Sequence, residues 1–555
     1  MNVLIGNAWP YANGSLHIGH IAALLPGDVL ARYFRAKGDT VFFVSGSDCH
    51  GTPVAIRAKQ KNKTPEEISD YYHNEFDYCF NRLGFSYDLY GKTSSNEHKS
   101  FVTDFHRKLY DGGYVYEKST PQAYCDKCKQ FLPDRFVKGS CPHCAENARG
   151  DQCEACGTVL EPENLIQAEC SICGKPPEFR STNHLYLAVT RMKDELEKYI
   201  QSHSDWRKNA YEMSKRYIRE GLRDRSLTRD LDWGIDVPKE GFDSKKIYIW
   251  AENVLGYLST CHTLCNQQGL DFDEFWNNCR QYYVHGKDNI PFHTIILPSL
   301  LLGRTDVKLK LPDDIISSEY LTLEGKKIST SGNWAIWAKD ILERYSPDSI
   351  RYFLISNGPE KRDTDFTWRE FINSHNGELL GAYGNFVNRS LVFIQKSFEG
   401  KVPETQGNQG CFSEQQDILS TSPSIIQSLI RLYPIVGSLI EHGCIKEALD
   451  TIFAFVRTAN KYFDEEQPWI TVKSEITKCK ETLNTCVQII ANLSLLLDPF
   501  LPFSSAKIRD ILKIGNAVWK YIEIPAGFEL GQVEILFERI DKKVIQEETV
   551  RLTNQ

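Results

Sequence analysis

Two histidines three residues apart, His17 and His20, lie in the segment PYANGSLHIGH (residues 10–20). Helical spacing places both rings on one face at the start of a helix. The exposed backbone N–H groups at a helix start favour an anion. Gly19 between the histidines has no side chain, so a flat ring could lie against the helix. The pattern fits a nucleotide site, but it also fits a metal site or two surface histidines without a function.

A second segment with the right chemistry lies far along the chain. The sequence GKKISTS (residues 325–331) combines glycine, lysines and hydroxyl side chains, as a loop that folds over phosphates would. The chain contains neither the GxxxxGK[ST] loop nor the GxGxxG fingerprint, the usual sequence patterns for nucleotide binding. The two segments together therefore favour nucleotide binding more than either one alone.

The elements around the histidines predict an α/β domain. A strand-like stretch (2–9) is followed by an Asn13-Gly14 turn, with Ser15 as the helix cap. An apolar helix is expected over 16–36, and a second strand over 40–48. A strand–helix–strand unit implies a parallel sheet. Within the helix, Pro26 predicts a kink or a restart, and Gly38 marks the end.

Length and composition set the limits. At 555 residues the chain should form three or four domains. Its net charge of −8 argues against a uniformly basic protein, so a nucleic acid would have to meet a local basic face. The apolar start lacks a basic leader region, and no apolar run is long enough to span a bilayer, so we expect a cytoplasmic protein. In that compartment the 17 cysteines should stay reduced.

Eight of the cysteines fall between Cys125 and Cys173. They form four CxxC pairs: Cys125 and Cys128, Cys141 and Cys144, Cys153 and Cys156, Cys170 and Cys173. Each pair supplies two thiolates, so eight fit two closed, structural four-cysteine zinc sites. The pairs can be matched three ways, and the short linker between Cys144 and Cys153 favours joining the two inner pairs. A redox role would need one isolated pair and is the weaker interpretation.

The remaining segments divide the chain further. A Cys-, Gly- and Pro-rich stretch (122–175) reads as an inserted module. Sheet-like patterns follow at 245–250, 281–288 and 293–302. From about residue 376 the pattern is helical and predicts a bundle, with apolar residues at Ile445, Leu449, Ile452, Phe453 and Val456, and similar spacing over 483–497. Residues 401–424 read as a loop, and the tail after Gly515 is too short to be a domain.

The two signatures, His17-Ile18-Gly19-His20 and Lys327-Ile328-Ser329-Thr330-Ser331, resemble those of class I aminoacyl-tRNA synthetases. With PYANGSLHIGH, the cysteine knuckles and GKDNIPFH (286–293), the chain resembles the methionyl-tRNA synthetase family from residue 2 to about 512. The resemblance implies a Rossmann-like parallel-sheet catalytic domain with an inserted zinc-binding module, followed by an α-helical bundle that binds the anticodon. The expected boundaries are 1–115 and 231–320 for the catalytic halves, 116–230 for the insertion with knuckles at 124–175, 321–375 for the lysine loop and stem-contact region, 376–515 for the bundle and 516–555 for the tail.

This resemblance implies attack of the methionine carboxylate on the α-phosphorus of ATP, followed by transfer to tRNA(Met). An ionised carboxylate needs no general base, so binding and electrostatic stabilisation suffice, with Mg²⁺ on the phosphates. It implies His17, His20 and Lys327 as catalytic groups. The implied ATP-binding residues are Asn13, Gly19, Gly286, Asp288, Lys326, Lys327 and Thr330.

The second signature departs from the family at two positions. Thr330 stands where a second lysine is usual, and Gly332 where an arginine often follows. Loss of two cations beside the phosphates should slow activation. Our hypothesis is that Lys326 compensates; a bound monovalent cation is the alternative.

The family also implies a methionine pocket, an anticodon site and a zinc pairing. The pocket residues are Trp9, Tyr11, Asp48 (for the ammonium), Trp250, Asn253, Val254, Tyr257, Asn289, Ile290 and His293. Taken singly, its aromatic residues read as ordinary core, and Asn253 and Asn289 suggest a more polar pocket than usual. Asn385, Arg389 and Trp469 match anticodon readers, although the first two also fit a solvated helix face. The implied inner zinc set is Cys141, Cys144, Cys153 and Cys156, and the outer set is Cys125, Cys128, Cys170 and Cys173.

A basic stretch (214–230) reads as a linker helix near the tRNA acceptor end or as a salt-bridged surface helix, and Arg229 is the family's candidate for coupling the insertion to the active site. Many relatives carry a further C-terminal domain that dimerises them and grips tRNA. This chain stops at Gln555 without one, so we expect a monomer, with a separate tRNA-binding partner as the way to recover the lost contacts. The competing interpretations are another class I synthetase, a non-catalytic tRNA-binding paralogue and an unrelated zinc-ribbon nucleic-acid binder.

Overall fold

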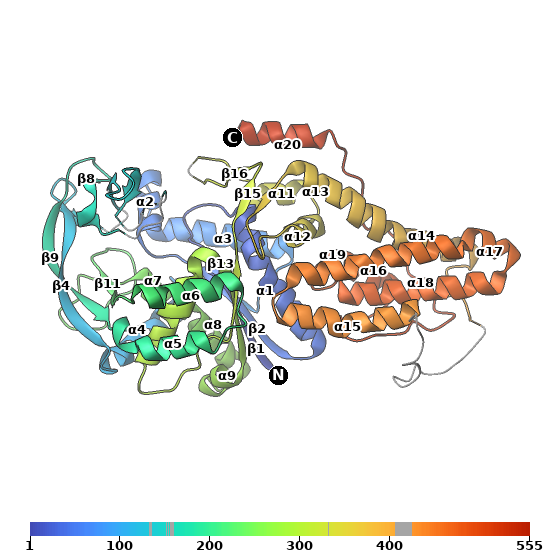
Figure 1. Cartoon of the computed structure of the whole chain (residues 1–555), viewed down its shortest axis with the longest axis horizontal. Coiled ribbons are helices and arrows are strands. Elements are labelled where there is room, and N and C mark those ends of the chain that lie inside the picture. Colours follow the sequence, from blue (N-terminus) through green and yellow to red (C-terminus); the bar gives the residue numbers. More distant parts are fainter. Residues whose placement is uncertain are drawn as a thin grey trace.

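The computed structural model describes residues 1–132, 136–150, 153, 155, 160–330, 332–405 and 424–554. Figure 1 shows an elongated molecule with a parallel sheet near its middle, a strand-rich module at one end and a helical bundle at the other. None of the helices in these residues is long and apolar enough to cross a membrane.

Five parallel strands form the central sheet, in the order β14-β13-β1-β2-β3. Their bounds are β1 Asn2–Asn7, β2 Thr40–Ser47, β3 Leu89–Lys92, β13 Arg280–Gly286 and β14 Asp314–Ser318. Strands β2 and β3 lie on one side of β1, and β13 and β14 lie on the other. Ligands of such sheets bind at the carboxyl ends of the strands where the order reverses, here between β1 and β13. The predicted strand–helix–strand unit and parallel sheet are confirmed.

Helix α1 (Ile18–Lys37) joins β1 to β2 and ends at Gly38, whose φ of 93° suits glycine. The predicted restart at Pro26 does not occur, because the helix continues through this residue. Residues on either side of Pro26 are buried, and packing of this face outweighs the hydrogen bond that proline removes.

The predicted cap, Ser15, is also wrong: α1 begins with His17 as its cap residue. The N–H of Ile18 donates to the carbonyl of Ile336 at 3.0 Å, and the N–H of Ala338 donates to that of Leu16 at 2.8 Å. This pairing keeps residues 16–18 extended, which delays the helix start beyond the reach of Ser15.

Two of the later strand predictions need correction: the one for residues 245–250 is only partly right, and the one for residues 293–302 is wrong. In residues 245–250 only β12 (Lys246–Ile247) is a strand, and α7 (Ile249–Glu252) follows it. Residues 293–302 are helical, lying in the π-helical segment Phe292–Ile296 and in α10 (Leu297–Gly303). An apolar run that is buried on all sides has no clear period, so its pattern does not separate a buried strand from a buried helix.

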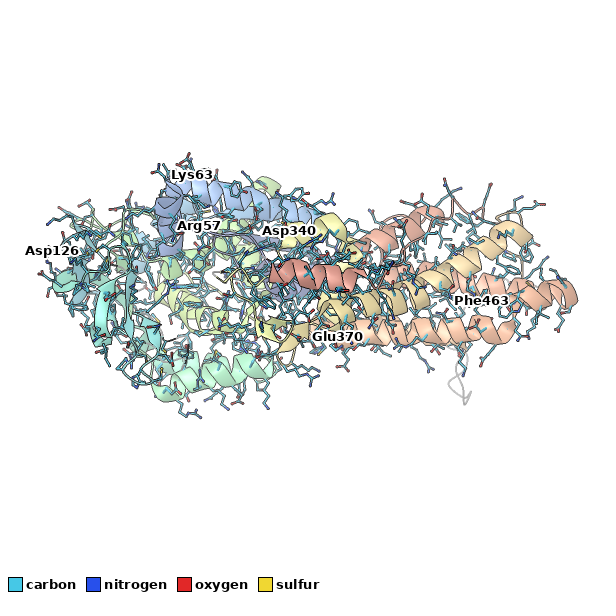
Figure 2. The ribbon with its side chains drawn as sticks, turned by 90° about the horizontal axis from the view of Figure 1, so that it is seen from above. Arg57, Lys63, Asp126, Asp340, Glu370 and Phe463 are labelled. Carbon is cyan, nitrogen blue, oxygen red and sulfur yellow. The ribbon has the colours of Figure 1, made fainter. Side chains whose placement is uncertain are left out.

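The inserted module extends from the sheet on two long antiparallel strands. These are β4 (Val115–Cys125) and β9 (Glu178–Leu187), flanked by β5 (Gln130–Phe131) and β10 (Arg225–Ser226). A small sheet of β7 (Asn147–Arg149), β6 (Val137–Ser140) and β8 (Ile166–Cys170) lies at their far end. Figure 2 labels Asp126 at this end of the molecule and Phe463 at the other.

The basic stretch 214–230 is not one helix. Helix α6 (Lys208–Glu220) covers its first part, and the rest forms β10 and β11 (Thr228–Arg229). The other helices around the sheet are α2 (Thr52–Lys61), α3 (Pro65–Leu83), α4 (Asn96–Asp111), α5 (Lys193–Gln201), α8 (Gly256–Gln268) and α9 (Phe272–Asn278).

A small sheet and three helices connect the two ends of the molecule. The strands are β15 (Leu321–Leu323), β16 (Lys326–Lys327) and β17 (Thr364–Phe366), and the helices are α11 (Ala338–Arg344), α12 (Pro347–Ser356) and α13 (Trp368–Ser374). Arg351 of α12 and Asp28 of α1 are fully buried, with Nη2 and Oδ2 2.7 Å apart. This ion pair joins the connecting region to the helix that packs on the central sheet.

The predicted helical bundle is present. Its elements are the π-helical segment His375–Gly384, α14 (Asn385–Ser397), α15 (Ile425–Glu441), α16 (Ile445–Glu466), α17 (Pro468–Ser474), α18 (Ile476–Leu496) and α19 (Pro502–Ile511). The predicted apolar face of α16 is buried. One continuous core joins the bundle to the α1 side of the sheet, and a separate core fills the opposite side. Most of the predicted 401–424 loop lies outside the described residues.

The tail after Gly515 is docked along its length. It pairs with the bundle, for example through the N–H of Ile524 and Oε1 of Gln488 at 2.8 Å. It ends in α20 (Val544–Thr553), which lies beside α11 and α13 (Figure 1). Although too short for a domain, the tail therefore returns from the bundle to the connecting region.

Candidate active site

His17 and His20 cap α1 reciprocally. The N–H of Gly19 donates to Nδ1 of His17, and the N–H of His17 donates to Nδ1 of His20, each at 3.1 Å. The rings stack with centroids 3.8 Å apart. Because a backbone N–H only donates, both Nδ1 atoms accept, and each neutral ring carries its proton on Nε2. Each histidine thus has one N–H donor left for a ligand.

Burial keeps both imidazoles neutral near pH 7. It lowers the pKa of His20 to about 4, and it lowers the pKa of His17 well below its usual range, with His20 adding to the effect. Neutral rings act here as hydrogen-bond donors rather than as cations. The positive end of the α1 dipole lies at the same place and favours an anion.

Close packing leaves little room for a side chain at Gly19. A Cβ at this position would lie 3.0 Å from Cε1 and Nδ1 of His17 and 3.4 Å from Cδ1 of Ile328. Ile328 belongs to residues 325–337, which we call the lysine loop. The two sequence segments predicted to share one site therefore meet at the tip of α1.

The lysine loop presents its two lysines differently. Lys326 Nζ lies 4.5 Å from the ring centroid of Trp334, and Lys327 Nζ lies 5.9 Å from that of Tyr320. Tyr320 donates to Asp288, just beyond the carboxyl end of β13. Successive residues of a strand face opposite sides, so Lys327 is the lysine on the side of β13.

The tip of the lysine loop lacks a cation. Ser329 and Trp334 pair through both backbone groups at 2.9 Å, and the N–H of Gly332 donates to Oγ of Ser329 at 3.0 Å. Thr330 is exposed at this tip. Ser331 lies outside the described residues.

Asp48 follows β2 and is buried beside the end of β1. Its backbone pairs with Pro10 and Ala12, at 2.9 and 2.8 Å. Asn253 Nδ2 donates to Oδ2 of Asp48 at 2.5 Å, while Oδ1 has no hydrogen-bond partner among the described residues. Burial and the nearby Glu252 raise the pKa of Asp48. A ligand cation beside Oδ1 would counteract both effects.

An aromatic cluster adjoins Asp48 through Tyr11, whose backbone pairs with that of Asp48. Trp250 stacks on Phe292 with centroids 3.6 Å apart and meets Tyr11 edge-on at 6.0 Å. The hydroxyl of Tyr257 and Nε2 of His293 lie 2.8 Å apart. Since Nδ1 of His293 donates to the carbonyl of Asn289 at 2.8 Å, its Nε2 accepts from Tyr257. An apolar, aromatic wall with few polar groups suits a small, mostly apolar ligand.

The other residues predicted for these sites lie in several different elements. Trp9 is buried and packs closely on Gly46 and Gly256, so it is also core. Val254 and Ile290 are fully buried. The remaining predicted positions are Asn13 in the turn after β1, Gly286 at the end of β13 and Arg229 in β11, stacked 4.0 Å over Tyr248.

The sequence prediction missed several residues of the site. Phe292 stacks on Trp250, Tyr320 holds Asp288, and His50 and Glu252 lie behind Asp48. Phe292 lies within the GKDNIPFH motif, so the sequence could have indicated that it belongs to the site. The others are brought to the site by contacts between segments that the local pattern does not reveal.

The described cysteines of the insertion form two groups. Cys125, Cys128, Cys170 and Cys173 gather in one, and Cys141, Cys144 and Cys153 in the other; Cys156 lies outside the described residues. In the first group Sγ of Cys125 is 3.5 Å from that of Cys173, and Sγ of Cys128 is 3.9 Å from that of Cys170. Tetrahedral Zn–S bonds place sulfur atoms about 3.8 Å apart. Both groups could bind a metal, and the spacing fits zinc.

At the far end of the bundle, Arg389 is held in a defined position. Its guanidinium lies 4.5 Å from the ring of Phe463 and 5.6 Å from that of Trp469, and Nη2 pairs with Asp464 at 2.7 Å. Trp469 is 41% exposed, and Asn385 is also exposed. An exposed aromatic ring beside an oriented arginine can stack on an unpaired base. Asp464 and Phe463 were not predicted from the sequence.

Comparison with known proteins gives consistent matches. Residues 3–391 match the family described as tRNA synthetases class I (M), and residues 424–555 match the anticodon binding domain of methionyl tRNA ligase. The chain is 51% identical to methionine–tRNA ligase 1 of Alkaliphilus oremlandii, covering 100% of both chains. It is 52% identical to methionine–tRNA ligase of Streptococcus pneumoniae, covering 100% of this chain and 99% of the relative.

The fold is similar to a solved structure of Mycobacterium tuberculosis methionyl-tRNA synthetase bound by methionyl-adenylate. The TM-score is 0.79 at 20% identity, over 97% of this chain and 100% of the other. At that identity the likeness concerns the fold.

Proposed function

The chain belongs to the methionyl-tRNA synthetase family of class I tRNA synthetases, and from this premise we propose how its own residues perform the reaction. Its activity is that of a methionine–tRNA ligase. A carboxylate oxygen of methionine attacks the α-phosphorus of ATP, the bond to the β-phosphate oxygen breaks, and pyrophosphate leaves. A ribose hydroxyl at the 3′ end of tRNA(Met) then attacks the adenylate carbonyl and releases AMP.

The observation that carries the residue assignment is the meeting of the lysine loop with the tip of α1. Backbone pairing holds residues 336–338 against residues 16–18, and Ile328 reaches Gly19. A triphosphate at this tip would have imidazole donors on one side and Lys327 on the other. Fixed donors aimed at growing phosphate charge are the main source of rate in such a reaction.

The two histidines act as hydrogen-bond donors through Nε2, and their backbone-bonded Nδ1 atoms keep the rings oriented. Lys327 supplies the cation. Asn13, Gly19, Gly286, Asp288, Lys326 and Thr330 complete the proposed nucleotide site. Mg²⁺ bound to ATP would neutralise part of the phosphate charge.

Methionine packs against the aromatic wall of Tyr11, Trp250 and Phe292, and its ammonium group pairs with the carboxylate of Asp48. We assign the side-chain slot to Trp9, Tyr11, Trp250, Asn253, Val254, Tyr257, Asn289, Ile290 and His293, and add Phe292 from its stacking on Trp250. One missing methylene changes binding by only about 1–3 kcal/mol. Homocysteine should therefore be activated weakly.

We assign zinc to both cysteine groups, in structural roles. Four thiolates close a tetrahedral site and leave no open position for a substrate. The sites hold the far end of β4 and β9, where the small core contains few apolar side chains.

Anticodon reading is assigned to Asn385, Arg389 and Trp469. These residues lie at the end of the bundle, remote from the sheet, as Figure 1 shows for α14 and α17. A tRNA can contact both regions only if it spans the length of the molecule. The continuous core between bundle and sheet supports a fixed spacing of the two sites.

Methionine-dependent exchange of pyrophosphate into ATP tests the proposed activation step. We expect exchange with methionine, weaker exchange with homocysteine and none with leucine. Thr330 and Gly332 are the observations that favour a second candidate, a tRNA-binding paralogue without catalysis. Absence of exchange, together with retained binding of tRNA(Met), would establish that candidate and overturn the assignment.

A further inference from the structure

A buried polar network lies behind Asp48. Its members are Asp48 at 1% exposure, His50 at 1%, Glu252 at 0% and Asn253 at 6%. Asp48 and His50 follow β2, whereas Glu252 and Asn253 lie at the end of α7 and just after it. Two carboxyl groups buried this close together require partners, because uncompensated burial of charge is strongly unfavourable.

Each carboxyl group has one fixed oxygen. Asn253 Nδ2 donates to Oδ2 of Asp48 at 2.5 Å, and Nδ1 of His50 lies 2.5 Å from Oε1 of Glu252. The second oxygens, Oδ1 of Asp48 and Oε2 of Glu252, have no hydrogen-bond partner among the described residues. The amide therefore fixes the orientation of the Asp48 carboxylate and leaves one oxygen for a ligand.

The groups around Asp48 act on its ionisation in opposite directions. Burial and the charge of Glu252 raise its pKa, while the Asn253 side chain and the backbone N–H of His50 lower it. His98 and Lys99 of α4 lie next to this network. Burial, His50 and Lys99 all lower the pKa of His98. Trp233 meets the His50 ring edge-on at 5.2 Å and donates to the carbonyl of Cys49 at 2.7 Å, closing this side.

We propose that Asn253 and the His50–Glu252 pair are positioning residues, which orient Asp48 and set its charge so that it receives the ammonium group of the amino acid. The inference rests on the proposed function, since it concerns how that substrate is held. Asn253 acts by donating to the carboxylate form of Asp48. Glu252 acts as a nearby like charge whose distance and orientation are fixed by His50.

The proposal predicts opposite pH shifts for two variants. The ammonium binds the ionised form of Asp48, so the KM for methionine rises as the pH falls through the pKa of this group in the free enzyme. Asn253→Ala removes a donor to the carboxylate and should move this rise upward by about one pH unit. Glu252→Gln removes the like charge and should move it downward by about one pH unit.

The experiment measures the KM for methionine in pyrophosphate exchange from pH 5.5 to 9, with ATP saturating. Methionine titration calorimetry in buffers of different ionisation enthalpy adds a second readout, the protons released on binding. Asn484→Ala is the matched control, because the Asn484 amide likewise donates to one oxygen, here the backbone carbonyl of Pro403 at 3.0 Å, but lies in the bundle. This control should keep the wild-type profile, and thermal unfolding checks that each variant is folded.

Opposite shifts of the two profiles would support the proposal. Unchanged profiles, or a weakening of binding by the same factor at every pH, would overturn it and leave the network a purely structural role. If one variant fails to fold, the other still gives a signed shift. Absence of exchange in the wild-type enzyme would instead contradict the proposed function, so the two failures are distinguishable.

Discussion

The backbone of His17 lies opposite that of Trp337 in a short antiparallel pairing. His17 caps α1 and Trp337 precedes α11, so the pairing fixes the lysine loop relative to the helix tip. The proposed triphosphate site is thus assembled from the two ends of the catalytic region.

The two lysines of the loop should differ in their effect on activation. Lys327→Ala removes the cation on the side of β13 and should lower the exchange rate by about 10²–10³-fold. Lys326→Ala should lower it by about tenfold, if Lys326 leaves Trp334 to replace the missing cation at Thr330.

Exchange assays with both variants check this prediction, with Lys339→Ala in α11 as the control for loss of a surface lysine. An unchanged rate for Lys326→Ala beside an abolished rate for Lys327→Ala would reject the compensating role. Comparing potassium, sodium and a bulky organic cation as counter-ions then tests the monovalent-cation alternative.

His20→Asn should separate capping from catalysis. Asparagine retains an acceptor within reach of the His17 N–H but lacks a donor at the place of Nε2–H. We expect kcat to fall about 10²–10³-fold while stability changes little. His20→Ala should lose the cap as well, which costs about 1 kcal/mol more in unfolding free energy.

The pH dependence of unfolding gives a further check on His20. Its pKa is about 4 when folded and its ordinary value is 6.5, so the unfolded chain binds a proton first as the pH falls. Its contribution to stability is complete above pH 6.5 and is lost towards pH 4, by at most about 1.4 kcal/mol per pH unit. Denaturant titrations at several pH values should show that the unfolding free energy of His20→Asn falls less steeply between pH 6.5 and pH 4 than that of the wild type. An equal dependence on pH would contradict neutral burial of the ring.

Zinc content should follow the two cysteine groups. The wild-type chain should hold two zinc ions, and Cys125→Ser and Cys141→Ser should each hold one, because each removes a thiolate from a different group. Metal analysis by mass spectrometry checks the ratio. The buried Cys486→Ser, outside both groups, is the control that should keep both ions; equal loss in all three variants would contradict separate sites.

Arg389→Ala should affect tRNA but not activation. The guanidinium is oriented by Phe463 and Asp464 at the end of the bundle, so its loss should raise the KM for tRNA(Met) by about tenfold or more. Pyrophosphate exchange should be unchanged. Arg457→Ala, an arginine paired with Glu378 on the same bundle, is the control; equal effects of the two substitutions would indicate a general electrostatic contribution.

Docking of the tail should depend on Glu548. This buried carboxylate of α20 accepts from Nε and Nη2 of Arg344, at 2.7 and 3.1 Å, and from the hydroxyl of Tyr345 at 3.0 Å. Glu548→Ala should lower the unfolding free energy by about 2–3 kcal/mol, because it leaves these donors without their partner. Glu547→Ala removes an exposed neighbour and should change the unfolding free energy by less than about 0.5 kcal/mol. An equally small loss for Glu548→Ala would show that docking of α20 contributes little to stability.

Local pattern accounts for the parts of the fold that were predicted correctly. The first strand–helix–strand unit, the end of α1 at Gly38 and the buried face of α16 each depend on residues close together in the chain. The apolar run 293–302 was assigned wrongly because complete burial removes the periodicity that separates a strand from a helix. The prediction of Ser15 as the cap is wrong because residues 16–18 pair with residues 336–338, which are too distant in the chain for a local sequence pattern to reveal.

The sequence by itself determined the chemistry available to this protein: two histidines at a helix start, a lysine-rich loop, four CxxC pairs and the family to which they belong. Only the tertiary structure decided how these groups are used. It set the Nε2–H tautomers of the histidines, put Lys327 rather than Lys326 on the side of β13, and placed Glu252 and Asn253 against Asp48. The physical reason is that residue type and short-range spacing fix which bonds a segment can make, whereas orientation, burial and ionisation depend on partners brought together from distant segments.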